Sequence, residues 1–261
     1  MKKTVLFLLS ILFATRCFCT PAMAKNNGYS WYCPHVKNHV QPTTGAELAF
    51  TESLDAYYID RKHSDPDASD KVIYLTFDAG YENGNVTKIL DILKDEDVPA
   101  AFFILGNLIT KNTELVCRME QEGHVVCNHT VHHKDMTTYD DTAFLAELNA
   151  LEVLYREQVG GEMSHYYRPP EGRFSRENLE CAKKNGYKTI FWSFAYPDWD
   201  NEKQMSASKA KSIIMDNVHN GEVMLLHPTS ATNASILQDV IRELKTKGYR
   251  FGTLDELTRG D

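Results

Sequence analysis

The stretch at 71–94, KVIYLTFDAGYENGNVTKILDILK, decides the fold class of this chain. Its first part, Val72 to Phe77, is a continuous apolar run of the kind that forms a buried strand. Its second part, Asn85 to Lys94, carries apolar side chains at helical spacing. A buried strand followed by an amphipathic helix predicts a βα unit, the building block of a parallel sheet covered by helices.

The same alternation of strand and helix patterns continues towards the C-terminus. Further strands are expected at 100–105, 125–128, 165–168, 189–194, 222–226 and 249–252. Further helices are expected at 110–122, 141–158, 175–185, 206–219 and 236–247. About seven βα units in 261 residues predict an α/β fold, a single-domain distorted (β/α) barrel.

The N-terminus has the pattern of a secretory signal peptide over residues 1–24. A basic start precedes an apolar run at 5–14 that is too short to span a bilayer. Small residues at Ala22 and Ala24 form a cleavage site, so we expect an exported, extracytoplasmic protein. An uncleaved N-terminal anchor is the alternative, because Arg16 interrupts the apolar run before that site.

The next stretch, residues 25–70, is polar and rich in turn residues, and we expect an extension packed on the barrel domain of residues 71–261. The formal charge of the chain is −8, and loss of residues 1–24 would take it to −11. Such an acidic chain argues against nucleic acid as a partner, because phosphates need clustered Lys and Arg. We expect no tight protein partner and a monomer.

Four cysteines follow the proposed cleavage site: Cys33, Cys117, Cys127 and Cys181. None forms a CxxC pair, so zinc-finger spacing is excluded. Export permits oxidation, and four cysteines allow three pairings between which the sequence does not choose. Buried free thiols are the simpler interpretation.

Charged or titratable side chains stand at five of the predicted strand ends. In a parallel barrel these carboxyl ends meet at one face, where the active site forms. Five such ends together are hard to explain by packing. They carry Asp78, His129 with His133, Arg168, Asp198 and His227.

These residue types together predict metal-assisted hydrolysis of an amide or ester. Asp78 is the candidate general base, since Gly80 and Asn83 intervene before the next helix and capping explains Asp78 poorly. His129 and His133, four residues apart, can share a Zn, Co, Ni or Fe ion if the segment turns helical. His227 is the candidate general acid.

Arg168 and Asp198 each have a structural alternative. Arg168 begins Arg-Pro-Pro-Glu-Gly and would pair with a site carboxylate to keep it ionised, unless the segment is simply a rigid loop. Asp198 would orient a histidine while Trp199 lines a sugar pocket, unless the two residues form an ordinary turn.

In order along the chain, five segments resemble the five motifs of the polysaccharide deacetylase (NodB-homology) family, over roughly residues 65–258. They are Thr76-Phe-Asp-Ala-Gly80, His129-x-x-x-His133, Arg168-Pro-Pro-x-Gly172, Asp198-Trp199 and Leu225-Leu-His227. The resemblance implies a distorted (β/α) barrel. It also implies roles for the residues: Asp78 as catalytic base tuned by Arg168, His227 as catalytic acid tuned by Asp198, His129 and His133 as metal ligands, and a backbone N–H near Glu171 for the oxyanion.

One position departs from the family pattern. The first motif usually carries a second aspartate that binds the metal, and here that position is Ala79. We therefore expect a divalent metal (Zn, Co, Mn or Ni) that is weakly bound by two histidines, with water or substrate completing the coordination.

Three longer segments are similar to motifs of the delta-lactam-biosynthetic de-N-acetylases of spore-forming bacteria. They are Thr76-Phe-Asp-x-Gly-Tyr-Glu-Asn-Gly84, Asn128-His-Thr130 and Arg168-Pro-Pro-Glu-Gly-Arg-Phe-Ser175. That resemblance implies de-N-acetylation of N-acetylmuramic acid in peptidoglycan strands without stem peptides, leading to the muramic-δ-lactam of spore cortex. A deacetylase of N-acetylglucosamine in peptidoglycan or chitin-like oligomers is the alternative, and a non-catalytic glycan-binding protein is a third. We expect substrate contacts from Tyr81, Glu82, Asn83, Pro170, Glu171 and Trp199.

Overall fold

The computed structural model of the chain describes residues 28–259 and contains eleven strands, most of them short. The proposed signal peptide at 1–24 lies outside the described residues. The strands are β1 (Tyr29–Ser30), β2 (Ala56–Tyr57), β3 (Lys71–Ala79), β4 (Ala101–Ile104), β5 (Val125–Asn128), β6 (Tyr166–Tyr167), β7 (Arg173–Phe174), β8 (Lys188–Ile190), β9 (Phe194–Ala195), β10 (Glu222–Leu226) and β11 (Tyr249–Phe251).

Helices connect most of these strands. The α-helices are α1 (Asn85–Asp95), α2 (Gly106–Lys111), α3 (Thr113–Gln121), α4 (Asp141–Gln158), α5 (Arg176–Lys184), α6 (Ala207–Asn217), α7 (Ala231–Thr246) and α8 (Leu254–Thr258). Short 3-10 helices are η1 (Ala46–Leu54), η2 (Arg61–His63), η3 (Met136–Thr138) and η4 (Pro170–Gly172).

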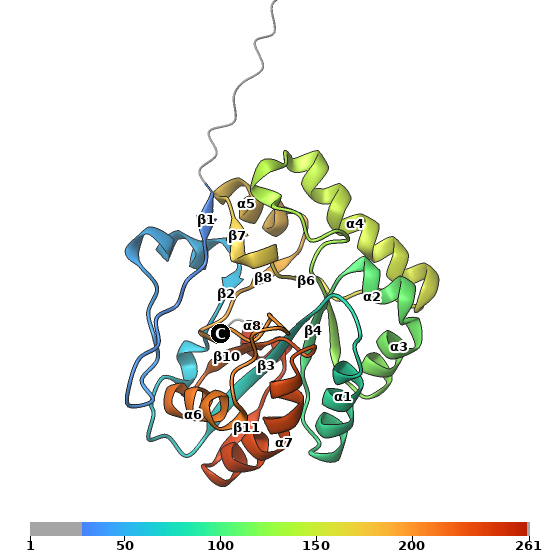
Figure 1. Ribbon diagram of the computed structural model, residues 1–261. Helices are drawn as coiled ribbons and strands as arrows, with labels where there is room; N and C mark the ends of the chain where they lie inside the picture. Colours follow the sequence, from blue (N-terminus) through green and yellow to red (C-terminus); the bar gives the residue numbers. More distant parts are fainter. Residues whose placement is uncertain (1–27, 260–261) are drawn as a thin grey trace, which may run out of the picture.

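Nine of the strands form one sheet that curls into a half-barrel with the helices around it (Figure 1). The order is β2-β8-β6-β5-β4-β3-β10-β9, and β11 pairs with the first residues of β3. Neighbouring strands within this sheet run parallel, as expected where helices connect them. The expected α/β fold, a distorted barrel in a single domain, is confirmed.

The central strand β3 is buried on both of its faces. Ile73, Leu75 and Phe77 face a layer shared with α1 and α7. Val72 and Tyr74 face the barrel interior, which Leu254 of α8 helps to fill. Burial on both faces explains why this strand has a continuous apolar run in the sequence rather than an alternating pattern.

Two expected elements are interrupted. The helix expected at 110–122 is split at Asn112, whose backbone is not helical, and its first part begins at Gly106. The strand expected at 189–194 is two strands, because the chain leaves β6 and β2 after Ile190 and reaches β10 at Phe194. The helix expected at 236–247 begins at Ala231, and α8 was not expected.

The segment before β3 contributes to the main sheet. Its strand β2 pairs with β8, and Trp31 stacks on Phe191 with ring centroids 4.1 Å apart. Trp31, Leu48 and Tyr58 are buried in one cluster with residues of the barrel. The extension is therefore part of the barrel's packing rather than a loose covering.

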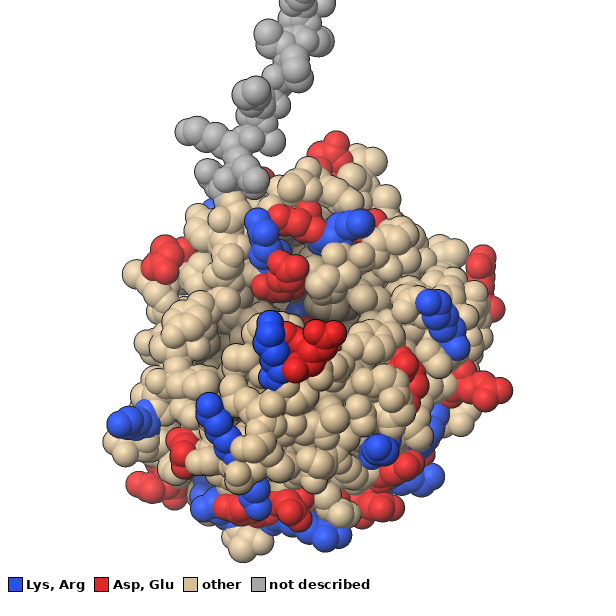
Figure 2. Space-filling view, viewed as in Figure 1, with Lys and Arg blue, Asp and Glu red and all other residues tan. Residues whose placement is uncertain are grey.

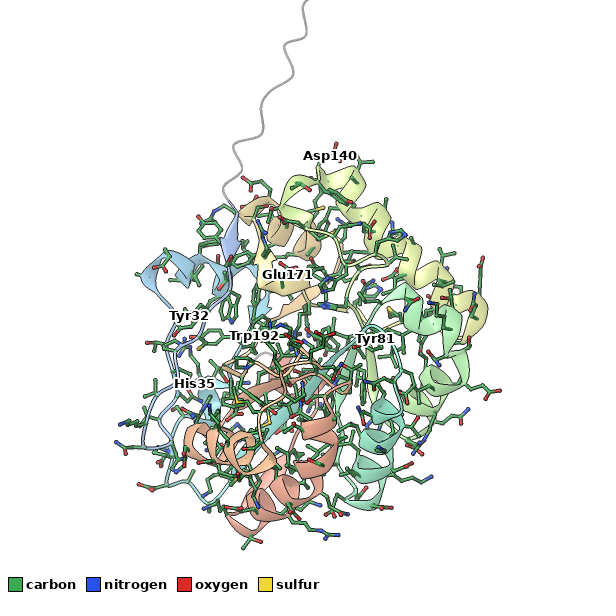
Figure 3. The ribbon with its side chains drawn as sticks, in the orientation of Figure 1. Tyr32, His35, Tyr81, Asp140, Glu171 and Trp192 are labelled. Carbon is green, nitrogen blue, oxygen red and sulfur yellow. The ribbon has the colours of Figure 1, made fainter. Side chains whose placement is uncertain are left out.

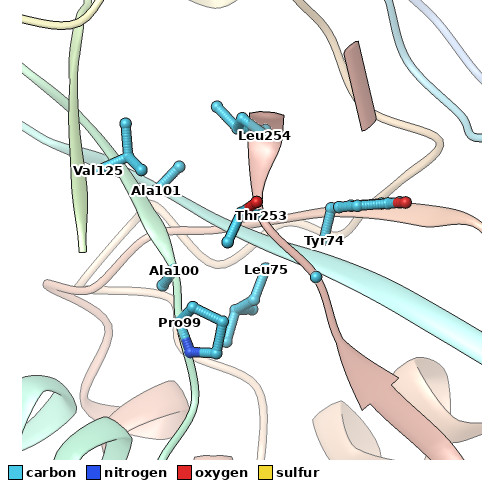
Figure 4. Close-up of a pocket in the computed structure, with 9 residues that line it drawn as sticks. Tyr74, Leu75, Pro99, Ala100, Ala101, Val125, Thr253 and Leu254 are labelled. Carbon is cyan, nitrogen blue, oxygen red and sulfur yellow. The ribbon is translucent and has the colours of Figure 1, made fainter. Parts of the chain in front are cut away.

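Three further features concern the cysteines, the membrane-spanning potential of the helices and a small internal cavity. The four cysteines of the described region are free thiols. None of the helices among residues 28–259 is both long and apolar enough to cross a bilayer. A cavity of about 10 Å³ under β3 and β4 (Figure 4) offers the least space that one water molecule needs, so it holds no substrate.

Candidate active site

A cleft of about 750 Å³ opens where the carboxyl ends of the central strands meet. Four titratable side chains that the sequence singled out line it: Asp78, His129, His133 and His227. Trp199 also lines it. So do Tyr81, Glu171 and Trp192, which Figure 3 labels. Arg168 and Asp198 lie behind this wall, fully buried, and contact the lining residues from within the protein.

Asp78 is held by a buried guanidinium. The Nη1 of Arg168 donates to Asp78 Oδ1 at 2.8 Å, and the rest of the guanidinium bonds Thr76 Oγ1 and the carbonyls of Ile190 and Phe191. Burial raises the pKa of Asp78, but the charges of Arg168 and the nearby histidines lower it by more, and the pKa lies below its usual value. Asp78 is thus a carboxylate at neutral pH.

The two histidines expected to bind metal are brought together by a loop. The segment after β5 is not helical: Thr130 and His133 both have left-handed backbones, with φ of 71° and 55°. Thr130 Oγ1 accepts from the backbone N–H of His133 and fixes this turn. The rings of His129 and His133 lie with centroids 5.0 Å apart, so the expectation of a helical i, i+4 pair is wrong while the pairing itself occurs.

His129 is positioned to offer a lone pair to the cleft. Its Nδ1 lies 2.8 Å from the carbonyl oxygen of Arg168, which can only accept, so Nδ1 carries the proton. Its Nε2 lies 3.6 Å from Asp78 Oδ2. Burial lowers the pKa of His129 to about 4, which keeps the ring neutral, the form that binds metals.

His227 is oriented by Asp198. Its Nδ1 lies 2.7 Å from Asp198 Oδ1, and its backbone N–H donates to Oδ2 of the same carboxylate at 2.8 Å. Asn233 from α7 donates to Asp198 Oδ2 and to the carbonyl of His227. Burial lowers the pKa of His227, but the hydrogen bond and charge of Asp198 raise it by more, so the pKa lies above its usual value.

The turn after Arg168 forms one side of the cleft. Glu171 has a left-handed backbone with φ of 56°, a strained conformation for a residue other than Gly. Gly172 lies beside it with φ of 66°, and a side chain there would meet Trp192 and Trp31. Such strain at a cleft wall is typical of functional sites.

Three of the expected substrate-binding residues do not line the cleft. The carboxylate of Glu82 accepts from the backbone N–H groups of Gly84 and Val86 at the start of α1. Asn83 donates to the carbonyl of Thr229, and Pro170 is buried in the turn. Glu82, Asn83 and Pro170 thus hold the loops that carry Tyr81 and Glu171.

The sequence interpretation missed several residues of this site. Trp192 and Tyr196 line the cleft, and Asn233 and Thr76 bond its buried supports. Trp192 lies within the run expected as one strand at 189–194, and Tyr196 follows β9 directly. The sequence pattern of α7 gives no indication that Asn233 supports the site.

The donor set suits a divalent metal with an incomplete protein shell. Two imidazoles face one cleft beside the carboxylate of Asp78, and imidazole is a preferred ligand of Zn, Co and Ni. Ala79 adds only a methyl group. Within residues 28–259, no three His, Cys, Asp or Glu side chains are grouped so as to hold a metal ion. The fit is to two protein ligands, with the remaining positions left to water or substrate.

The charges around the site are mixed. Figure 2 shows basic and acidic side chains interspersed over the viewed face. The residues that line the cleft in the described chain include Asp78 and Glu171 but no Lys or Arg. On this face the basic side chains therefore alternate with acidic ones and do not gather into a basic patch.

Known proteins share both the sequence and this fold. Residues 65–190 match the sequence profile of the family described as polysaccharide deacetylase. An uncharacterised protein of Geobacillus stearothermophilus is 40% identical over 254 residues, 97% of this chain and 94% of that protein. The peptidoglycan-N-acetylmuramic acid deacetylase PdaA of Bacillus subtilis is 37% identical over 233 residues, 89% of this chain and 86% of that protein.

Two further comparisons bear on the chemistry. The solved structure of PdaA, described as a family 4 carbohydrate esterase, superposes with a TM-score of 0.82 and covers 89% of this chain and 97% of its own. A peptidoglycan-N-acetylglucosamine deacetylase of Bacillus cereus is 32% identical over 189 residues, 71% of this chain and 67% of that protein.

Proposed function

Because this chain belongs to the polysaccharide deacetylase family, we propose that it hydrolyses the acetamide of N-acetylmuramic acid in peptidoglycan strands that lack stem peptides. One observation carries the chemistry: a base and an acid line the same cleft, each held by its own buried partner. The 37% identity with PdaA supports the choice of muramic acid.

Asp78 acts as the general base. Its pKa is held below the usual value, so the carboxylate is free of a proton when a water molecule arrives in the cleft. Asp78 takes a proton from that water as the oxygen forms its bond to the acetamide carbon. Arg168 keeps the carboxylate ionised and fixes its Oδ1, leaving Oδ2 towards the cleft.

His227 acts as the general acid. Its raised pKa favours the protonated ring, and Asp198 fixes Nδ1 so that Nε2 is the nitrogen that donates. As the carbon–nitrogen bond breaks, the proton goes to the leaving amine, and acetate and a free amino sugar result. We assign the stabilisation of the carbonyl oxygen to a backbone N–H near Glu171.

A metal would be held by His129 and His133. When bound, a divalent ion supplies Lewis acidity to the acetamide carbonyl and to the attacking water. Family members generally depend on a metal. The burial that keeps His129 neutral removes competition from protons for this role.

Weak metal binding is the expected consequence of Ala79. Dialysis against a chelator should remove activity, and added Zn, Co, Mn or Ni should restore it. The variant Ala79→Asp should bind the metal more tightly, measured by competition with a metal-sensitive dye. The control is Ala195→Asp, which places a carboxylate elsewhere in the cleft lining. Equal affinity of the Ala79→Asp variant and the wild type would contradict the two-ligand site.

Export follows from the substrate, which lies outside the cytoplasm. We infer that residues 1–24 direct this export and that the protein works as a monomer in the cell wall, or between the forespore membranes. In that setting the freed amine closes on the lactyl carboxyl and gives the muramic-δ-lactam of spore cortex.

N-acetylglucosamine deacetylation is the second candidate, and one feature of the cleft favours it. Muramic acid carries a lactyl carboxylate, yet no Lys or Arg of the described chain lines the cleft. The B. cereus relative, named as a peptidoglycan-N-acetylglucosamine deacetylase, supports the same alternative.

Acetate release from purified glycan strands tests these functions. Strands with and without stem peptides are tested as substrates, and chitooligosaccharides are tested in parallel. The masses of the products are measured by mass spectrometry. Asp78→Asn is the control for the base. Release from peptide-free strands alone, followed by loss of water from the product, is the expected result.

Two other outcomes would change the conclusion. Release from chitooligosaccharides instead would assign the enzyme to N-acetylglucosamine. No release with any divalent metal would leave a non-catalytic glycan-binding protein.

A further inference from the structure

The segment Tyr29–His35 runs along the rim of the cleft and is fixed there. Tyr29 and Ser30 pair with β7, directly after the turn that carries Glu171. The backbone N–H of Trp31 donates to the carbonyl of Gly172 at 2.8 Å. At the other end, His35 Nε2 lies 2.9 Å from the carbonyl oxygen of Ala195. Because Gly172 and Ala195 line the cleft, the segment is bound to its wall at two points.

Burial alternates along this segment. Trp31 and Cys33 are 5% and 8% exposed, whereas Tyr32 between them is 69% exposed. Trp31 is anchored by its stacking on Phe191 and by its indole N–H, which donates to the carbonyl of Trp192 at 2.8 Å. Neighbouring side chains on an extended chain point in opposite directions, so the anchoring of Trp31 turns Tyr32 outwards.

Tyr32 lies beside the aromatic wall of the cleft, because its neighbour Trp31 is bonded to Trp192. Among the described residues, the exposed large aromatics are Tyr32, Tyr81 and Trp199, and the latter two line the cleft. In Figure 3, Trp192 lies between Tyr32 and Tyr81 on the viewed face. Single exposed apolar residues are ordinary, but aromatic side chains exposed both in a binding cleft and beside it together indicate an interaction site.

We propose that Tyr32 is an outer stacking platform for a polysaccharide chain, contacting a sugar residue beyond the one that lies in the cleft. A pyranose ring presents a face of C–H groups that packs on an aromatic ring, and the phenol oxygen can bond a sugar hydroxyl. The identity of the chain rests on the proposed function. The platform implies that the protein prefers polymeric strands to single repeats.

Binding of strands of two lengths tests this inference. Peptide-free peptidoglycan strands of a single disaccharide repeat and of several repeats are titrated into the full chain in a calorimeter. The wild type should bind the long strand more tightly. Tyr32→Ala should bind it about three- to tenfold more weakly, with affinity for the short strand unchanged, and Tyr32→Phe should keep most of the gain.

Val40→Ala is the matched control. Val40 belongs to the same N-terminal region and is 47% exposed. Its neighbours His39 and Gln41 bond the carbonyls of Val218 and Asn220. These two residues precede β10, at the amino ends of the strands, whereas the cleft lies at their carboxyl ends. This variant should bind both strands as the wild type does.

Acetate release, measured in parallel, separates this inference from the proposed function. Equal affinity for long and short strands, or an unchanged affinity in Tyr32→Ala, would overturn the platform even if acetate is released. Binding that depends on length and on Tyr32 without acetate release would support the platform and overturn the proposed function. No binding of either strand would overturn both.

Discussion

Arg168 is fully buried, and Asp78 is the carboxylate that neutralises it. Arg168→Met should lower the free energy of unfolding by about 3–5 kcal/mol, because it leaves the carboxylate of Asp78 buried without its cation. Urea unfolding followed by circular dichroism measures this. Arg156→Met is the control, since Arg156 pairs with Glu162 at the surface, and it should leave stability nearly unchanged. A variant at Arg168 as stable as the wild type would refute the prediction.

The pairing of Asp198 with His227 should be visible in the pH dependence of activity. His227 donates its proton only while protonated, so kcat falls as the pH rises through its pKa. Asp198 raises that pKa against the lowering effect of burial. Asp198→Asn should therefore move the alkaline limb of kcat to lower pH.

A pH–rate profile with a control at the neighbouring carboxylate checks this. Asp200 lies close in sequence but pairs with Lys203 at the surface. Asp200→Asn should keep the wild-type profile. If Asp198→Asn also keeps it, another group governs the alkaline limb.

The residues that the sequence could predict are those at strand ends. Topology alone brings Asp78, His129 and His227 to one face, whatever the loops do. Trp192 and Asn233 reach the site differently, through a chain crossing and through a helix packed behind His227. Such contacts depend on tertiary packing, for which no local pattern exists.

The N-terminus of helix α1 is bonded by the side chain of Glu82, which was expected from the sequence to contact substrate. Glu82 accepts from Gly84 and Val86, and also from the hydroxyl of Thr87, in place of an ordinary N-cap. Glu82→Ala should lower the free energy of unfolding by about 1 kcal/mol, because it leaves the first N–H groups of α1 without an acceptor. Chemical unfolding is the measurement.

The control for Glu82 is an acid in the first turn of another helix. Glu177 lies in the first turn of α5, where Ser175 provides the cap. Glu177→Ala should be nearly neutral. If Glu82→Ala instead raises KM at unchanged stability, Glu82 binds substrate as the sequence suggested.

The chain between β8 and β9 shows what periodicity cannot detect. The run from Thr189 to Phe194 is mostly apolar and reads as one strand. In the fold it crosses between two edges of the sheet: Phe191 bonds Tyr57 of β2, and Ser193 bonds Val223 of β10. Most residues of the run are buried, but the pairing partner changes, and the crossing places the partly buried Trp192 in the cleft wall.

At the scale of the whole molecule, the sheet depends on a segment outside the βα repeat. The alternation from β3 onwards predicted the barrel, whereas β2 has only two residues and no alternating pattern. Nevertheless β2 covers the edge of β8, and the cluster of Trp31, Leu48 and Phe191 closes that side of the core. An uncovered parallel edge would leave backbone groups of a buried strand without partners.

This dependence predicts the effect of truncation. A chain that starts at residue 65, where the family match begins, should lose cooperative thermal unfolding. It lacks β2 and the N-terminal members of the buried cluster, among them Trp31, Leu48 and Tyr58. A chain that starts at residue 28 keeps every described contact and should unfold as the full chain does. Trp31→Ala, a milder change, should cost about 3–5 kcal/mol. Cooperative unfolding of the shorter chain at an unchanged Tm would show that the barrel from β3 onwards is self-sufficient and that the N-terminal segment serves the cleft alone.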